Sequence, residues 1–116
     1  MAKFMRDIGH ALPQFNASVD DAPGVLVQAG NTLLTGYSIL NATAAVAYVQ
    51  LFNAAALADV TLGTTTPTYV IGNAASDVIA RSFAYPLYFA LGLCIFSTTT
   101  ATGLTGAAQN VSLEYA

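Results

Sequence analysis

Charged residues are scarce in this chain of 116 residues. They make up 8% of the sequence, against roughly 25% in an ordinary soluble domain. The intervals 22–58 and 82–113 contain none at all. Two classes of protein share such a deficit: proteins embedded in a membrane, and proteins whose surface is largely covered by copies of themselves or by a partner.

Long hydrophobic runs are also lacking. A helix that spans a membrane needs about 20 predominantly apolar residues, whereas the best apolar run, Leu87–Phe96, is about half that length and follows Pro86. No membrane-spanning helix and no membrane partner are therefore expected. Residues 1–15 contain neither a continuous apolar segment nor a small-residue cleavage site, so we interpret them as part of the mature protein.

Cations and cysteine are nearly absent. Lysine and arginine together number 3, and the net charge is −3. Because nucleic-acid binding by phosphate neutralisation needs clustered cations, no nucleic-acid partner is expected. The one cysteine, Cys94, excludes an internal disulfide and a zinc site built from cysteines. Reactive thiols sit in electropositive, accessible surroundings, so Cys94 is expected to be buried and inert.

Groups that carry out catalysis are few and scattered. His10 is the one histidine, and no nucleophile or second base lies near it in the sequence. Asp20 and Asp21 lack the ligand spacing of a helix-loop calcium site and fit a turn better. The glycines do not follow a phosphate-binding pattern. The sequence therefore predicts a protein that is not an enzyme and needs no metal or cofactor.

What the sequence does contain is a series of short alternating segments separated by turn residues. The length fits one domain. The pattern predicts an all-β fold, an antiparallel β-sandwich or jelly roll of about seven to nine short strands with an N-terminal arm. The expected strands are Gln14–Val19, Val25–Gln28, Leu33–Asn41, Ala45–Asn53, Thr68–Ile71, Leu87–Thr98 and 111–115.

The segment Ala45–Asn53 can be written as a helix or as a strand. Alanine is the best helix former, but Tyr48 and Phe52 alternate with smaller residues, and aromatic and β-branched residues favour a pleated surface. We predict a strand here, followed by a helical turn or loop over Ala54–Ala58. In the preceding strand, Gly36 predicts a bulge or a close backbone approach.

Strict alternation would place Leu33, Tyr37 and Ile39 on one face of their strand. Further along, Gly72-Asn73 predicts a turn.

Residues 74–84 contain Asp77 and Arg81 at helical spacing, but we predict a strand and loop at the solvated rim. The most hydrophobic segment, Leu87–Thr98, is predicted to be one central strand with Phe89 in the core.

We divide the chain into residues 1–24, an N-terminal arm with the first short strand, and residues 25–116, the sandwich domain. Phe4 and Ile8 lie four residues apart, as on a short amphipathic helix. Residues 1–13 are either a tail without fixed structure or an arm that docks on a neighbouring subunit.

Aromatic residues accompany the low charge, with six tyrosines and six phenylalanines in the chain. Contact surfaces between proteins deplete Lys, Glu and Asp and enrich aromatics. The sequence therefore predicts a surface made to be covered. The candidate interface residues are Phe4, Ile8, Tyr37, Tyr48, Tyr69, Tyr85 and Tyr88.

Four segments together resemble a group of small virion proteins of tailed phages. They are GYSILNATAAVAYVQLFNAA, VTLGTTTPTYVIG, FALGLCIFSTTTATG and the terminal NVSLEYA. The resemblance covers about residues 31–116 and leaves residues 1–30 outside. Its motifs are structural, and no catalytic residue is carried over.

The resemblance implies a β-sandwich that acts as a capsid decoration (cement) protein. Such a protein is made in the host cytoplasm, binds between major capsid subunits at the virion surface and stabilises the head. A homotrimer is implied as the oligomeric state. The alternative is a tail-associated or fibre-associated module that binds a receptor or a carbohydrate.

Overall fold

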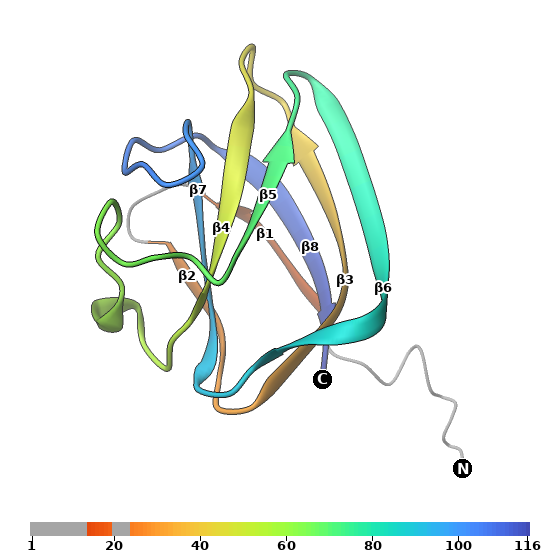
Figure 1. Ribbon diagram of the computed structural model, residues 1–116. Coiled ribbons are helices and arrows are strands. Elements are labelled where there is room, and N and C mark those ends of the chain that lie inside the picture. The colour runs from red at the N-terminus through yellow and green to blue at the C-terminus, as the bar shows by residue number, and fades with distance from the viewer. Residues whose placement is uncertain (1–13, 20–23) are drawn as a thin grey trace.

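Eight β-strands form two antiparallel sheets that pack face to face as a β-sandwich (Figure 1). The computed structural model describes residues 14–19 and 24–116. No helix among these residues is long and apolar enough to cross a membrane. The elements are β1 (Gln14–Val19), β2 (Val25–Ala29), β3 (Thr32–Asn41), β4 (Ala47–Asn53), the 3-10 turn η1 (Leu57–Asp59), β5 (Tyr69–Asn73), β6 (Asp77–Phe89), β7 (Gly92–Thr98) and β8 (Gln109–Tyr115).

The strand pairs are nested. β1 pairs with β8, β2 with β7, β3 with β6 and β4 with β5, always antiparallel. Successive pairs belong to alternate sheets. Within the first sheet, β3 pairs with β8 and so links the two pairs of that sheet; within the second sheet, β4 pairs with β7 in the same way. The strand orders are β1-β8-β3-β6 in the first sheet and β2-β7-β4-β5 in the second. The predicted all-β architecture is confirmed.

The core lies between the two sheets, where alternate side chains of both meet. β4 confirms the strand predicted at Ala45–Asn53, although it begins two residues later. Phe89 is fully buried in this core, as predicted. Each large apolar side chain buried here contributes about 1.5–3 kcal/mol. The buried members are Leu34, Ile39, Val49, Leu51, Ile71, Phe89, Leu93, Ile95, Val111 and Leu113.

The outer face of the second sheet is covered in part by the loop that joins β4 to β5. Phe52 and Phe96 meet edge to face on this outer side, with ring centroids 5.6 Å apart. Leu57, Val60 and Leu62 of the loop pack over them and over Cys94. The helical turn expected near Ala54–Ala58 is present as η1, which starts this covering.

Cys94 is completely buried under that loop, as predicted. Burial raises the pKa of its thiol, and the nearby Asp59 carboxylate raises it further. We therefore expect a thiol reagent to leave the native protein unmodified at neutral pH and to label it stoichiometrically in denaturant. Rapid labelling of the folded chain, followed by mass spectrometry, would contradict this assignment.

Gly36 lies at a bulge, as predicted, and the bulge changes which side chains of β3 face the core. The register of β3 shifts between Leu34 and Gly36 against both of its neighbours. Leu34 is therefore buried and Leu33 is 40% exposed, while Ile39 beyond the bulge is buried. The expectation that Leu33 shares a face with Tyr37 and Ile39 is wrong, because one extra residue inverts the alternation.

The prediction of a single strand over Leu87–Thr98 is wrong. β6 runs on to Phe89, the chain turns at Ala90 and Leu91, and β7 begins at Gly92. The reason is the backbone of Gly92, whose φ is 147°, in a region that residues with a side chain rarely adopt.

The strand and loop predicted at residues 74–84 are also corrected, because residues 77–84 lie throughout in the longer β6 and no loop interrupts them. This strand bends sharply at a bulge of residues 83–86 (Figure 1), where Pro86 is tolerated.

The turn predicted at Gly72-Asn73 is also wrong, because both residues belong to β5. The Asn73 amide is buried and donates to the Ile39 and Asp77 carbonyls, each at 3.2 Å. Asn41, fully buried beside it, donates to the Asn73 carbonyl at 3.2 Å. These two side-chain amides hydrogen-bond to backbone carbonyls of both sheets at one end of the sandwich. Asn73 therefore stabilises the fold from within a strand.

Candidate interaction surface

No described residue covers the outer face of the first sheet, in contrast to that of the second. Side chains of β3, β6 and β8 that point away from the core are exposed or half-buried along most of each strand. The register places Ser38 of β3 directly opposite Ala80 of β6 and Ser112 of β8. Three adjacent strands therefore contribute only short side chains at this level of the sheet.

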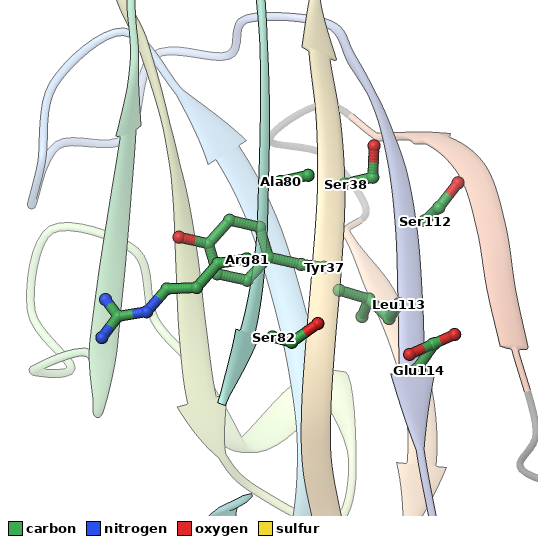
Figure 2. Close-up of a pocket in the computed structure, with 8 residues that line it drawn as sticks. All are labelled: Tyr37, Ser38, Ala80, Arg81, Ser82, Ser112, Leu113 and Glu114. Carbon is green, nitrogen blue, oxygen red and sulfur yellow. The ribbon is translucent and has the colours of Figure 1, made fainter. Parts of the chain in front are cut away.

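A hollow of about 340 Å³ lies on this face. Its floor is low because the next position of the middle strand is Gly36, which stands opposite Ser82 and Glu114. A Cβ atom at Gly36 would lie 2.9 Å from the Arg81 carbonyl oxygen, so no larger residue fits without a shift of the backbone. Tyr37, Ser38, Ala80, Arg81, Ser82, Ser112, Leu113 and Glu114 line the hollow (Figure 2).

The hollow is weakly charged. In Figure 2, Glu114 stands at its border near the serine hydroxyls, while the Arg81 side chain extends away from them beside the Tyr37 ring. In the described part of the chain the charged residues are Asp59, Asp77, Arg81 and Glu114. The face therefore offers hydroxyl groups and backbone, with a single carboxylate at the border.

Apolar side chains flank the hollow at both ends. At one end Leu40 stands opposite Val78, and they are 38% and 57% exposed. At the other end Leu33 stands opposite Tyr88, and they are 40% and 57% exposed. The Tyr88 hydroxyl donates to the Asn31 side-chain oxygen at 2.9 Å, which orients the ring. The face thus combines a small polar hollow with two apolar borders.

An aromatic cluster fills the open side of the sandwich between β5 and β6. The Phe83 ring lies 5.8 Å from Tyr37 and 6.0 Å from Tyr69, measured between centroids. The Arg81 guanidinium lies 5.1 Å from the Phe83 ring centre and donates to the Tyr69 hydroxyl at 3.3 Å. Burial raises the pKa of Tyr37, as does Tyr69, while Arg81 opposes the rise.

The structure distributes the candidate tyrosines over different environments. Tyr37 and Tyr69 come together in the aromatic cluster and are only partly exposed. Tyr48 is half-buried on the second sheet, near Gly72. Tyr85 and Tyr88 are the exposed ones, and Tyr85, at the bend of β6, is 87% exposed. Phe4 and Ile8 lie outside the described residues.

Of the residues that line the hollow, Tyr37 alone is among the interface candidates predicted from the sequence. The signal that was available is the strand alternation of Ser38, Ala80, Ser82 and Ser112, four small residues on strands otherwise rich in larger ones. Their shared location depends on strand register, which only the structure supplies. Among the described residues, no group of three or more His, Cys, Asp or Glu side chains could hold a metal ion.

Comparisons with known proteins return no similar chain. No protein-family model, no curated protein and no solved structure matches this sequence.

Proposed function

We propose that this protein is a structural component of a tailed-phage virion, a capsid decoration protein that binds the major capsid protein and stabilises the head. The observation that carries the proposal is the open outer face of the first sheet, a weakly charged surface with a central hollow and apolar borders. The proposed role needs neither catalysis nor a cofactor. The partner is a protein of the capsid shell.

The strand order supports the proposal. In a jelly roll, eight strands in two sheets follow from two Greek keys, an arrangement found in viral capsid and lectin domains. The nested pairs of this chain, from β1 with β8 inwards to β4 with β5, are what rolling up one long antiparallel hairpin produces. We therefore assign the sandwich to the jelly-roll type.

The chemistry of the face supports it as well. Interface cores deplete charged residues, and shape complementarity there matches that of protein interiors. The outer face of the first sheet bears Leu33, Leu40, Val78 and Tyr88 around the hollow, with Glu114 as the carboxylate at its border. A partner that fills the hollow with a protruding side chain would cover both apolar borders at once.

The test is association of the full chain with empty shells of the phage that encodes it. Mass measurement of shells with and without the chain is expected to show a saturable gain in mass and a higher temperature of shell disruption. If the chain leaves the shells unchanged but binds isolated tails or host cells, the decoration role is excluded.

A substitution in the hollow sharpens this test. Ser38→Arg places a long charged side chain in the hollow from an exposed position, so the fold should tolerate it while shell binding falls about tenfold or more. Ala55→Arg, at an exposed site on the loop over the second sheet, is the matched control and should bind normally. Equal binding by both variants would exclude the hollow as the contact.

A second candidate is a tail-associated or fibre-associated module that binds a carbohydrate receptor. The observation that favours it is the exposure of Tyr85 and Tyr88 near the bend of β6, because aromatic rings with a polar tip suit wet binding surfaces. This candidate predicts that the isolated protein binds glycans and that Tyr85→Ala abolishes this binding. A decoration protein would show no glycan binding.

A further inference from the structure

The outer edge of β6 is a second surface, and no described strand pairs with it. Among the strands of residues 14–19 and 24–116, β6 is the last of the first sheet and pairs with β3 alone. Exposed sheet edges are templates for pairing with another chain, and proteins protect them with proline and bulges. The second half of β6 has both, a bulge at residues 83–86 and Pro86. The first half, residues 77–82, pairs regularly with β3 and has neither.

This regular half carries two opposite charges that do not meet each other. Asp77 and Arg81 are both exposed, and four residues along a strand span about 13 Å. Their hydrogen-bond and ring partners among the described residues are neutral: the Asp77 carboxylate accepts the Val78 N–H at 2.8 Å, and Arg81 contacts the Tyr69 hydroxyl and the Phe83 ring. An oppositely charged partner for each can come from another chain.

We propose that β6 of one molecule pairs antiparallel with β6 of a second copy, about a twofold axis at Ile79. In this register Asp77 stands opposite Arg81 of the second copy, and the same contact recurs on the other side of the axis. Val78, which is 57% exposed, stands opposite Ala80 of the second copy. The edge is therefore complementary to itself in charge.

The register is selected by these charges. Cross-strand pairs of opposite charge are favourable and like charges directly opposite are unfavourable. An axis at Asp77 or at Arg81 would place like charges opposite each other, and an axis at Val78 or Ala80 would leave both charges opposite uncharged residues. Only the axis at Ile79 satisfies both charges at once.

The pairing joins the two first sheets into one sheet of eight strands. The twofold axis of an antiparallel strand pair is perpendicular to the sheet, so both outer faces, each with its hollow, lie on the same side. The proposed docking surface is then doubled. A pair of this kind closes on itself, and it differs from the trimer that the resemblance implies.

The mass of the full chain in solution, measured over a range of concentrations, is the first test. We expect a species of twice the 12.0 kDa chain mass. Asp77→Arg and Arg81→Asp, each alone, bring like charges together twice per pair and should weaken it about tenfold to a hundredfold. The double variant, Asp77→Arg with Arg81→Asp, exchanges the charges and should restore pairing.

A crosslink tests the position of the axis. Ile79→Cys places two thiols opposite each other at a Cα separation that a disulfide can span, so oxidation should give a covalent dimer. Ser38→Cys, exposed on the outer face, is the matched control and should stay uncrosslinked.

A monomer at all concentrations, a trimer, no rescue by the double variant or equal crosslinking of the control would each overturn the pairing. The two proposals can be tested separately. A trimer that binds shells would contradict the β6 pairing but agree with the decoration role. A dimer that does not bind shells would agree with the pairing but exclude the decoration role.

Discussion

Replacing Phe89 with alanine is expected to lower the free energy of unfolding by about 3–5 kcal/mol, the range for large aromatic residues removed from a core. The Phe89 side chain is fully buried between the sheets. It stands at the end of β6, opposite Thr32 of β3, and packs in the core cluster of both sheets. Its removal leaves a cavity that two hydrogen-bonded sheets cannot close. Denaturant unfolding, followed by tyrosine fluorescence, measures the change.

Tyr85→Ala is the control on the same strand. Tyr85 is 87% exposed, so its removal should alter stability by no more than about 0.5 kcal/mol. Equal effects of the two substitutions would show that Phe89 is not a core residue. The pair also separates folding from binding, because Tyr85 is a candidate contact residue and Phe89 is not.

The strands that the sequence predicts well are those bounded by strong turn residues. The bounds of β1 agree residue for residue, because Pro13 precedes it and an Asp-Asp-Ala-Pro-Gly segment follows it. β4 was predicted in spite of its alanines, since alternation of Tyr48 and Phe52 with smaller residues is typical of a strand. In both cases the pattern lies within the strand and its flanking residues, so it does not depend on contacts with distant parts of the chain.

The strand boundary between β6 and β7 could not be obtained in this way. Leu87 to Phe96 is apolar almost throughout, so hydrophobic alternation gives no mark of a turn within it. A glycine inside such a run is equally compatible with a bulge or a close approach. The turn at Ala90 and Leu91 depends on the positive φ of Gly92 and on the loop carbonyl of Ala54 nearby, which are tertiary features.

The location of the hollow on the outer face also depends on contacts between distant residues. Ser38 meets Ala80 and Ser112 only because β3 lies between β6 and β8 in one register. The bulge at Gly36 was predicted, but its effect on which side chains face outward follows only from counting residues on both partner strands. Low charge and abundant tyrosine predict a covered surface, and the face that we propose for it follows from the strand pairing.

Gly92→Ala is expected to destabilise the protein by about 2–6 kcal/mol. A Cβ atom at this position would lie 2.6 Å from the Ala54 carbonyl oxygen and 2.8 Å from that of Gln28. Both oxygens belong to backbone held in place: the Ala54 N–H donates to the Gly92 carbonyl at 3.1 Å, and β2 is paired with β7 here. Overpacking costs about 1–3 kcal/mol, and an unfavourable backbone conformation costs a further 1–3 kcal/mol.

Gly30→Ala separates these two contributions. Gly30 also has a positive φ, 83°, but nothing lies within 4 Å of the position its Cβ would take. The Gly30→Ala variant should therefore lose only the stability that the unfavourable backbone conformation costs, about 1–2 kcal/mol. The difference between the two variants in denaturant unfolding measures the steric contribution at Gly92 together with the difference in backbone cost between φ values of 83° and 147°. If both lose the same stability, the close approach of β7 to Ala54 and Gln28 does not determine where the apolar run is divided into two strands.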